Sequence, residues 1–243
     1  MYCPYDRNLP LEEDSLRDRL AGVENRIAQA LERTGHKRSD ITLVAVSKKF
    51  SAQRIREAYS VGLREFGENY VQEFAAKRPE LRDVPEARFH LIGHLQSNKA
   101  RQASELFQVV ETVDSPRLLR RLNVVAGELR VPIEVLFEIK LSHEESKTGA
   151  LPDELPSLVK ASEECPQLTI SGLMTVPPWS ENPEDSRPYF RKLATLARQY
   201  GFSTLSMGMS GDFEVAIEEG STTIRVGTAL FGARPKPAAV VNT

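Results

Sequence analysis

Two adjacent lysines follow an apolar run of residues, and a lysine in that position could react with a carbonyl group. The run at 41–46 reads ITLVAV, and Ser47, Lys48 and Lys49 come directly after it. A lysine aimed into an apolar environment loses part of its preference for the charged form, and its neutral amine can then form a Schiff base with an aldehyde. Alternation along a strand puts the two lysines on opposite sides, without saying which side is inside. On these residues alone, a solvated cation at the end of a strand is the better explanation of Lys48.

Two glycine-containing loops in the last part of the chain could bind an anion. In the motif MSGD, Ser210 offers a hydroxyl and Gly211 lets a ligand approach the backbone, directly before a helical pattern. In the motif RVGTALFG, Gly227 and Thr228 repeat the pairing of a glycine with a polar residue. Either loop by itself is better explained as an ordinary turn.

The elements that position these residues are apolar, β-prone segments that alternate with amphipathic helical patterns. Strands are predicted at 41–46, 64–69, 88–93, 109–113, 133–141, 168–176, 203–209 and 222–230. The clearest helical patterns are 13–34, 51–62 with Ser51 as N-cap, 115–130 with Ser115 as N-cap, 184–201 ending at Gly201, and 212–220 ending at Gly220. Strand–helix alternation implies parallel strands with crossover helices. Eight such units in 243 residues favour a closed (β/α)8 barrel, preceded by an extra N-terminal helix, over an open sheet.

The predicted barrel gives the two loops and the lysines a common location. Functional residues of such barrels lie at the C-terminal ends of the strands, and the loops after strands seven and eight commonly hold a phosphate. The MSGD and RVGTALFG motifs occupy those two places, so together they favour a phosphorylated ligand. A phosphate on one side and a lysine on the other predict a ligand that lies across the barrel mouth. Pyridoxal 5'-phosphate (PLP) carries both an aldehyde and a phosphate.

Composition narrows the class of protein. The net charge of -2 argues against nucleic acid as a partner, because phosphate neutralisation requires a strongly basic surface. Cys3 and Cys165 suggest no disulfide framework, and no apolar stretch resembles a signal peptide or a membrane span, so we expect a cytoplasmic protein without membrane contact. We expect a single domain over 1–243, with its core at about 13–234 and a disordered tail at 235–243.

Six motifs occur in order between about residues 13 and 234. They are LVAVSKKF (43–50), FGENYVQE (66–73), HLIGHLQSNK (90–99), ESKTG (145–149), GLMTV (172–176) and LSMGMSGDFEVAIEEGSTTIRVGTALFG (205–232). Together they resemble the pyridoxal phosphate homeostasis protein family, also called the YggS or proline synthetase co-transcribed family. The resemblance implies a single barrel like the N-terminal domain of alanine racemase, with PLP held as an internal aldimine.

The resemblance also implies a role for individual residues. The lysine after the serine of AVSK is Lys48, which becomes the covalent anchor of PLP, while Lys49 receives no role. The other cofactor-binding positions are Ser210, Gly211, Gly227 and Thr228 at the phosphate, Arg225 at the pyridine nitrogen, and Asn69, Met174 and Met207 along the ring. An arginine donates hydrogen bonds and does not accept them, so the ring nitrogen stays unprotonated and PLP becomes a weaker electron sink.

The function implied by the resemblance is a non-catalytic, monomeric carrier that buffers PLP and passes it to PLP-dependent apo-enzymes. Racemases of this barrel type add a β-domain that brings a tyrosine to the opposite face of the ring. We expect no such domain here, because the sequence ends soon after the last predicted strand. An amino-acid racemase of the alanine racemase type is the main alternative. Two further alternatives are a phosphosugar-type barrel enzyme and a protein-binding adaptor.

Four other side chains could have functional roles, but the sequence supports those roles less well. His90 lies in the predicted strand 88–93, which contains Gly93, and His94 directly follows that strand, so the two share no helical face and a metal site is disfavoured. We expect structural roles for them, or positions near the ring. Lys147 is predicted to be an exposed loop cation, and Trp179 an anchor of its loop.

Overall fold

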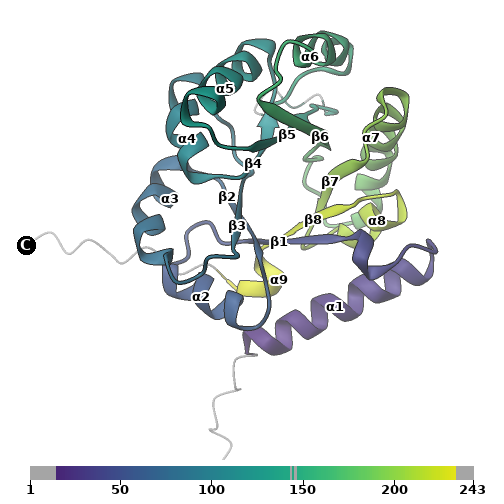
Figure 1. Ribbon diagram of the computed structural model, residues 1–243. Helices are drawn as coiled ribbons and strands as arrows, with labels where there is room; N and C mark the ends of the chain where they lie inside the picture. Colours follow the sequence, from purple (N-terminus) through teal and green to yellow (C-terminus); the bar gives the residue numbers. More distant parts are fainter. Residues whose placement is uncertain (1–14, 143, 145–146, 234–243) are drawn as a thin grey trace, which may run out of the picture.

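The computed structural model describes residues 15–142, 144 and 147–233, and its centre is a closed barrel of parallel strands (Figure 1). The strands follow one another around the barrel in chain order, and the pairing of the first with the last closes it. They are β1 Thr42–Val46, β2 Glu65–Glu68, β3 Arg88–Leu91, β4 Val109–Val113, β5 Ile133–Glu138, β6 Leu168–Met174, β7 Thr204–Met209 and β8 Thr223–Val226. The predicted barrel is confirmed, and each of the eight predicted strands is present.

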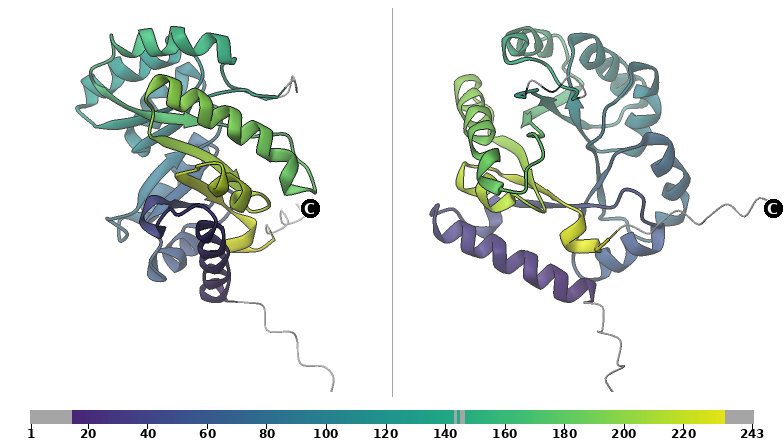
Figure 2. Two further views of the ribbon diagram at one scale, coloured as in Figure 1. Left: turned by 90° about the vertical axis from the view of Figure 1, so that its right-hand side faces the viewer. Right: turned by 180° about the vertical axis from the view of Figure 1, so that it is seen from behind.

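Helices cover the outside of the barrel, as the further views in Figure 2 show. Within the described residues they are α1 Leu16–Glu32, α2 Ala52–Ser60, α3 Val71–Lys77, α4 Ala100–Leu106, α5 Pro116–Leu129, α6 Leu155–Ser162, α7 Arg187–Tyr200, α8 Phe213–Glu218 and α9 Thr228–Phe231. Short 3₁₀ segments lie at Arg38–Asp40, Arg78–Leu81, Ser97–Lys99, Pro152–Glu154 and Pro183–Ser186. None of the described helices is both long and apolar enough to cross a membrane.

The predicted extra helix before the first strand is α1, which lies along α8 and α9 on the outer side of the barrel (Figures 1 and 2). It begins with a capping box, in which the Asp18 N–H donates to Ser15 Oγ at 3.2 Å and the Asp18 carboxylate accepts from the Ser15 N–H. Val23 and Ile27 belong to the apolar stripe that the sequence predicts, and both are buried. Burial of this stripe, more than helix propensity, therefore holds α1 in place.

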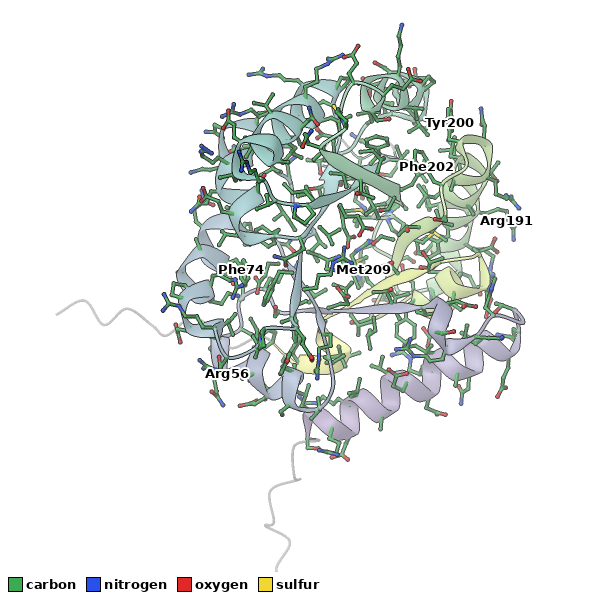
Figure 3. The ribbon with its side chains drawn as sticks, in the orientation of Figure 1. Arg56, Phe74, Arg191, Tyr200, Phe202 and Met209 are labelled. Atoms are coloured by element: carbon green, nitrogen blue, oxygen red, sulfur yellow. The ribbon has the colours of Figure 1, made fainter. Side chains whose placement is uncertain are left out.

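The apolar core lies mainly between the strands and the surrounding helices. Phe74 of α3 contacts Phe89 of β3 and Phe107 after α4, with ring centroids 4.5 and 4.9 Å apart. Figure 3 shows Phe74 on this outer side and Met209 nearer the barrel axis. The interior of the barrel is more polar, since Glu111 and Arg225 are buried there. This polar interior leads to the mouth of the barrel, where the predicted site lies.

Some boundaries differ from the prediction for local reasons. The predicted eighth strand, 222–230, ends at Val226, because the N–H groups of Gly227 and Ala229 donate to Ser210 Oγ while the chain turns into α9. Ser51 precedes α2 as expected, but its hydroxyl makes no capping hydrogen bond. The predicted disordered tail at 235–243 lies outside the described residues.

Candidate functional site

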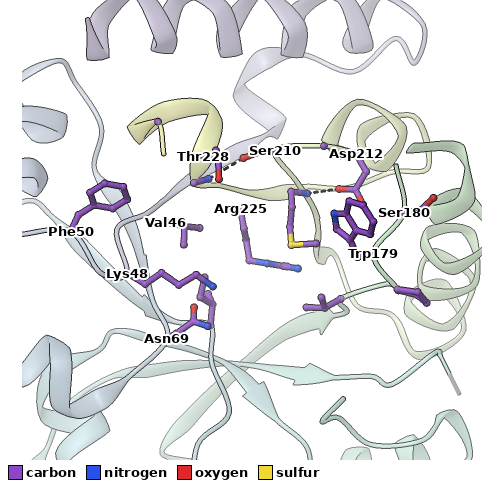
Figure 4. A pocket seen from close by; sticks show the side chains of 17 residues that line it. Val46, Lys48, Phe50, Asn69, Trp179, Ser180, Ser210, Asp212, Arg225 and Thr228 are labelled. Atoms are coloured by element: carbon purple, nitrogen blue, oxygen red, sulfur yellow. Dashed lines mark hydrogen bonds between the residues drawn. The ribbon is translucent and has the colours of Figure 1, made fainter. Parts of the chain in front are cut away.

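A cavity of about 470 Å³ opens at the C-terminal end of the barrel (Figure 4). Seven of the nine predicted site residues line it, from segments far apart in the sequence: Lys48, Asn69, Ser210, Gly211, Arg225, Gly227 and Thr228. The rest of the lining is Val46, Phe50, Ile92, Val176, Pro178, Trp179, Ser180, Met209, Asp212 and Gly232. The fold thus gathers one amine, one guanidinium and a glycine- and hydroxyl-rich loop pair around a single space.

The turn after β1 separates the two lysines. Val46 and Lys48 both line the cavity, and Figure 4 shows the Lys48 side chain directed into it. Lys49 has a left-handed backbone, with φ at 65°, and is exposed outside the cavity. Its N–H donates to Glu73 Oε1 at 2.6 Å, which holds the turn in this uncommon conformation. The ambiguity that strand alternation leaves between the two lysines is therefore resolved by geometry, in favour of Lys48.

A buried ion cluster supports the loop that carries Lys48. The Lys77 ammonium donates to Glu68 Oε1 at 2.7 Å and to Glu73 Oε1 at 2.9 Å. It also donates to the carbonyls of Ser47 at 3.3 Å and Phe50 at 3.2 Å, on either side of the two lysines. Burial raises the pKa of Glu68, while the charge of Lys77 and its hydrogen bond lower it. Sequence reasoning missed Lys77, because no sequence pattern distinguishes this lysine near the end of α3 from an exposed helical lysine.

The loops after β7 and β8 meet at one wall of the cavity. Ser210 Oγ accepts hydrogen bonds from the N–H groups of Gly227 at 3.2 Å and Ala229 at 3.3 Å. A Cβ built on Gly211 would meet no heavy atom within 4 Å, so the space beside that backbone is open. Asp212 closes the turn, accepting from the Met209 N–H at 2.7 Å. Backbone N–H groups and hydroxyls at an open wall can accommodate an anion.

Arg225 lies between the lysine and the interior of the barrel, and it is 4% exposed. One guanidinium nitrogen, Nη1, donates to Ser206 Oγ at 2.6 Å, and Nη2 donates to the Thr175 carbonyl at 2.8 Å. The Glu111 carboxylate is the nearest opposite charge, with Oε2 3.9 Å from Nη1. Burial lowers the pKa of Arg225, and the charge of Glu111 opposes that shift. The guanidinium is thus held by fixed partners, and Arg225 also lines the cavity.

The two remaining predicted residues, Met174 and Met207, are not among the described residues that line the cavity, and their position along the ring stays a prediction. Met174 packs inside the barrel against Leu136. Met207 is fully buried in the core between sheet and helices. The register of β7 shifts between Ser206 and Met209, and Gly208 has a φ of 93°. Ordinary alternation already directs Met207 outward, since its neighbour Ser206 points to Glu111 inside the barrel. The irregularity then turns Met209 into the cavity.

The other residues that the sequence singles out have different surroundings. His90 is buried between Glu65 and Glu111 inside the barrel, while His94 is half-exposed, with Nδ1 3.6 Å from Asp114 Oδ2. His90 is not among the residues that line the cavity, whereas His94 lies beside it, in a hollow that shares Asn69, Ile92 and Val176 with the cavity. His90 therefore has the structural kind of environment that the sequence favours over a metal site.

Two loop predictions are wrong. Lys147 is not a freely exposed cation, since Nζ donates to the carbonyls of Val176 at 3.3 Å and of Pro177, and it pairs with Glu144 Oε2 at 3.0 Å. It thereby ties its own loop to the loop after β6. Trp179 does not anchor its loop, because it is 80% exposed at the rim of the cavity.

Comparison with known proteins gives consistent matches over most of the chain. The family model described as alanine racemase, N-terminal domain, matches residues 19–235. The pyridoxal phosphate homeostasis protein of Aquifex aeolicus is 42% identical over 223 residues, which cover 89% of this chain and 97% of that protein. The protein of the same name from Escherichia coli K12 is 43% identical over 222 residues, covering 88% of this chain and 95% of that protein.

Solved structures also match this chain over most of its length. PipY of Synechococcus elongatus, solved with PLP bound, has a TM-score of 0.79 and 39% identity to this chain. The match covers 90% of this chain and 100% of PipY. An alanine racemase from Bacillus anthracis has a TM-score of 0.64 and 16% identity, over 89% of this chain and 57% of the racemase. At that identity the likeness to the racemase concerns the fold alone.

Proposed function

Because this chain belongs to the family of pyridoxal phosphate homeostasis proteins, we propose that it binds PLP through Lys48 and acts as a non-catalytic carrier of that cofactor. The observation that carries the proposal is the cavity in which Lys48, Arg225 and the Ser210 loop surround one space. Relatives with this name, and a structural neighbour solved with PLP bound, identify the ligand class.

The described residues fit the three functional ends of PLP. Lys48 supplies an amine for the aldehyde, and Arg225 supplies N–H donors for the pyridine nitrogen. Ser210, with the N–H groups of Gly227 and Ala229, supplies donors for the phosphate, and the open space beside Gly211 leaves room for it. A cavity of about 470 Å³ lies within the usual range for small-molecule sites. When bound, PLP supplies an electrophilic carbon that amines attack.

The charged groups of the cavity favour retention of the cofactor over catalysis with it. Among the described lining residues, the ionisable side chains are Lys48, Asp212 and Arg225. Asp212 is occupied by the turn it closes, accepting from the Met209 N–H and from Ser186 Oγ at 2.8 Å. Lys48 is then the single lining group suited to move a proton at a substrate carbon. Racemisation needs a second base on the opposite face of the cofactor ring. The described lining residues therefore favour binding over racemisation.

Arg225 supports the same conclusion. A guanidinium stays protonated and carries no acceptor, so it can donate to the pyridine nitrogen but cannot leave a proton on it. Stabilisation of a carbanion by the pyridine ring is strongest when that nitrogen is protonated. The residue that faces the ring therefore limits carbanion chemistry while it still contributes to binding.

We include partner, assembly and location in the proposal. The recipients are PLP-dependent apo-enzymes, since a covalent but reversible lysine linkage can release the aldehyde to another amine. The proposed carrier is a monomer, in which one chain supplies Lys48, Arg225 and the Ser210 loop to the cavity. It works in the cytoplasm, in keeping with a buried free thiol at Cys165.

Absorption spectroscopy of the full-length protein with PLP tests the proposal. Wild type and Lys49→Ala should both show the visible band of lysine-linked PLP, while Lys48→Ala should lack it. A band that persists unchanged in Lys48→Ala would overturn the assignment of the anchor. Racemisation of alanine by the loaded protein, well above that by free PLP, would instead support the racemase alternative.

A further inference from the structure

A chain of polar side chains runs through the interior of the barrel, away from the cavity that holds Lys48. It begins at Arg225 of β8, whose Nη1 donates to Ser206 Oγ of β7 at 2.6 Å. Ser206 Oγ donates to Glu111 Oε2 of β4 at 2.5 Å. Glu111 Oε1 is 2.6 Å from His90 Nδ1 of β3, and His90 Nε2 is 2.7 Å from Glu65 Oε2 of β2. Five strands thus contribute one residue each to a continuous hydrogen-bonded chain.

The chain connects the two ends of the barrel. Arg225 lines the cavity at the C-terminal ends of the strands. His90 and Glu111 line a second, smaller cavity of about 190 Å³, whose other walls include Thr42 and Thr223, at the N-terminal ends of β1 and β8. Glu65 is the first residue of β2 and is partly exposed. The side chain that faces the cofactor site is therefore linked to residues at the opposite end.

Charges alternate along this chain. Both ring nitrogens of His90 lie within hydrogen-bond distance of a carboxylate oxygen, so both must donate and the ring is an imidazolium. Burial lowers the pKa of His90, but the hydrogen bonds to Glu111 and Glu65 raise it to about 9. Glu111 then lies between two cations, His90 and Arg225. Each buried charge has an opposite neighbour, which is the condition under which buried charges are tolerated.

Ser206 links the Glu111 carboxylate to the Arg225 guanidinium. A serine hydroxyl has one proton, and here Ser206 donates it to the Glu111 carboxylate. Its oxygen is then fixed as an acceptor toward Nη1 of Arg225. The Thr175 carbonyl accepts from Nη2, so two acceptors at different sites set the plane of the guanidinium. Without the charge of Glu111, the hydroxyl is free to rotate and one of these two constraints is lost.

We propose that Glu111 and His90 are positioning residues for the cofactor site, which act through Ser206 to hold the Arg225 guanidinium in the orientation that the bound ring meets. Neither residue lines the cavity, so neither can touch the ligand directly. The inference rests on the proposed function, since it concerns how tightly PLP is held.

Equilibrium binding of PLP to Glu111→Gln, Ser206→Ala and wild type tests this inference. Glutamine keeps the size of the side chain but removes its charge, and alanine removes only the hydroxyl link. We expect the dissociation constant for PLP to rise about tenfold or more in both variants, the usual effect of losing one hydrogen bond to a charged group. The absorption maximum of bound PLP should shift as well. Glu134→Gln is the matched control, because Glu134 lines the same small cavity but pairs with Arg88, outside the chain.

A double-mutant comparison separates positioning from general loosening of the barrel. If Glu111 acts through Arg225, then Glu111→Gln should change PLP binding less than about twofold when Arg225 is already glutamine. Additive effects in that background would contradict the inference. Wild-type affinity and an unchanged spectrum in Ser206→Ala would also contradict the inference. This variant tests the link to Arg225 even if Glu111→Gln does not fold. Failure of wild type to bind PLP at Lys48 would instead contradict the proposed function itself.

Discussion

Lys77 Nζ lies 2.7 Å from Glu68 Oε1 beneath the loop that carries Lys48, with side chains 10% and 0% exposed. The same ammonium donates to the carbonyls of Ser47 and Phe50, which flank the two lysines. The position of Lys48 therefore depends on a cation that is not itself among the residues that line the cavity.

Replacing Lys77 by methionine should destabilise the protein and disorder the lysine turn. The change leaves Glu68 and Glu73 without their cation, and breaking a buried ion pair from one side costs about 3–5 kcal/mol. Urea unfolding measures the loss. Lys192→Met, at an exposed position on α7, is the control and should stay within about 0.5 kcal/mol of wild type. An equally small effect at Lys77 would show that the ion cluster does not support the loop.

The imidazolium of His90 predicts a specific pH dependence of stability. Its pKa of about 9 in the native protein exceeds the ordinary value of 6.5, so the native state binds the proton more tightly than the unfolded state. The resulting stabilisation is complete below pH 6.5 and is lost as the pH rises through 9. Its size is on the order of 3 kcal/mol, from the shift in pKa. Denaturant unfolding between pH 6 and pH 9.5 measures it, and His90→Gln should flatten the curve. An unchanged slope in that variant would assign the dependence to another group.

Ser210 should govern the preference for a phosphorylated ligand. Its hydroxyl and the two N–H groups it now binds form the proposed phosphate contacts. Removing one hydrogen bond to a charged group costs about 1.5–3 kcal/mol, so Ser210→Ala should weaken PLP binding roughly 10- to 100-fold. Binding of pyridoxal, which has no phosphate, should change far less. Competition between the two ligands measures the ratio, and equal losses for both would place the phosphate elsewhere.

Trp179 should report on cofactor binding. It is the single tryptophan of the sequence, and it stands at the rim of the cavity. PLP absorbs where tryptophan emits, so its binding should quench the emission until one PLP is bound per chain. Lys48→Ala should need more PLP to reach the same quenching. Emission that stays constant while PLP becomes linked to the protein would show that the ligand binds away from this rim.

The sequence predicts the barrel well because hydrophobic periodicity and helix signals are local. The eight apolar runs, Pro116 at the start of α5 and Gly201 at the end of α7 are all read from nearby residues. The end of β8 cannot be predicted in this way, because the Ser210 hydroxyl of another loop accepts hydrogen bonds from the Gly227 and Ala229 N–H groups. Helices α3, α4 and α6 are short and give weaker patterns.

The site is less predictable because it depends on irregular backbone and on distant partners. Motif resemblance places Lys48, Arg225 and the two loops correctly around one cavity. It does not indicate Met209, which the shift in β7 register turns into the cavity. Nor does any sequence pattern show that the turn at Lys49 is left-handed.

Borohydride reduction of the PLP-treated protein, followed by proteolysis and mass spectrometry, tests the central claim most directly. Reduction makes a reversible lysine linkage permanent, so the modified peptide identifies the anchor. We predict one pyridoxyl group on Lys48 in wild type and in Lys49→Ala, and none on the corresponding peptide of Lys48→Arg. A pyridoxyl group found mainly on another lysine of the wild-type protein, or on none, would contradict the account.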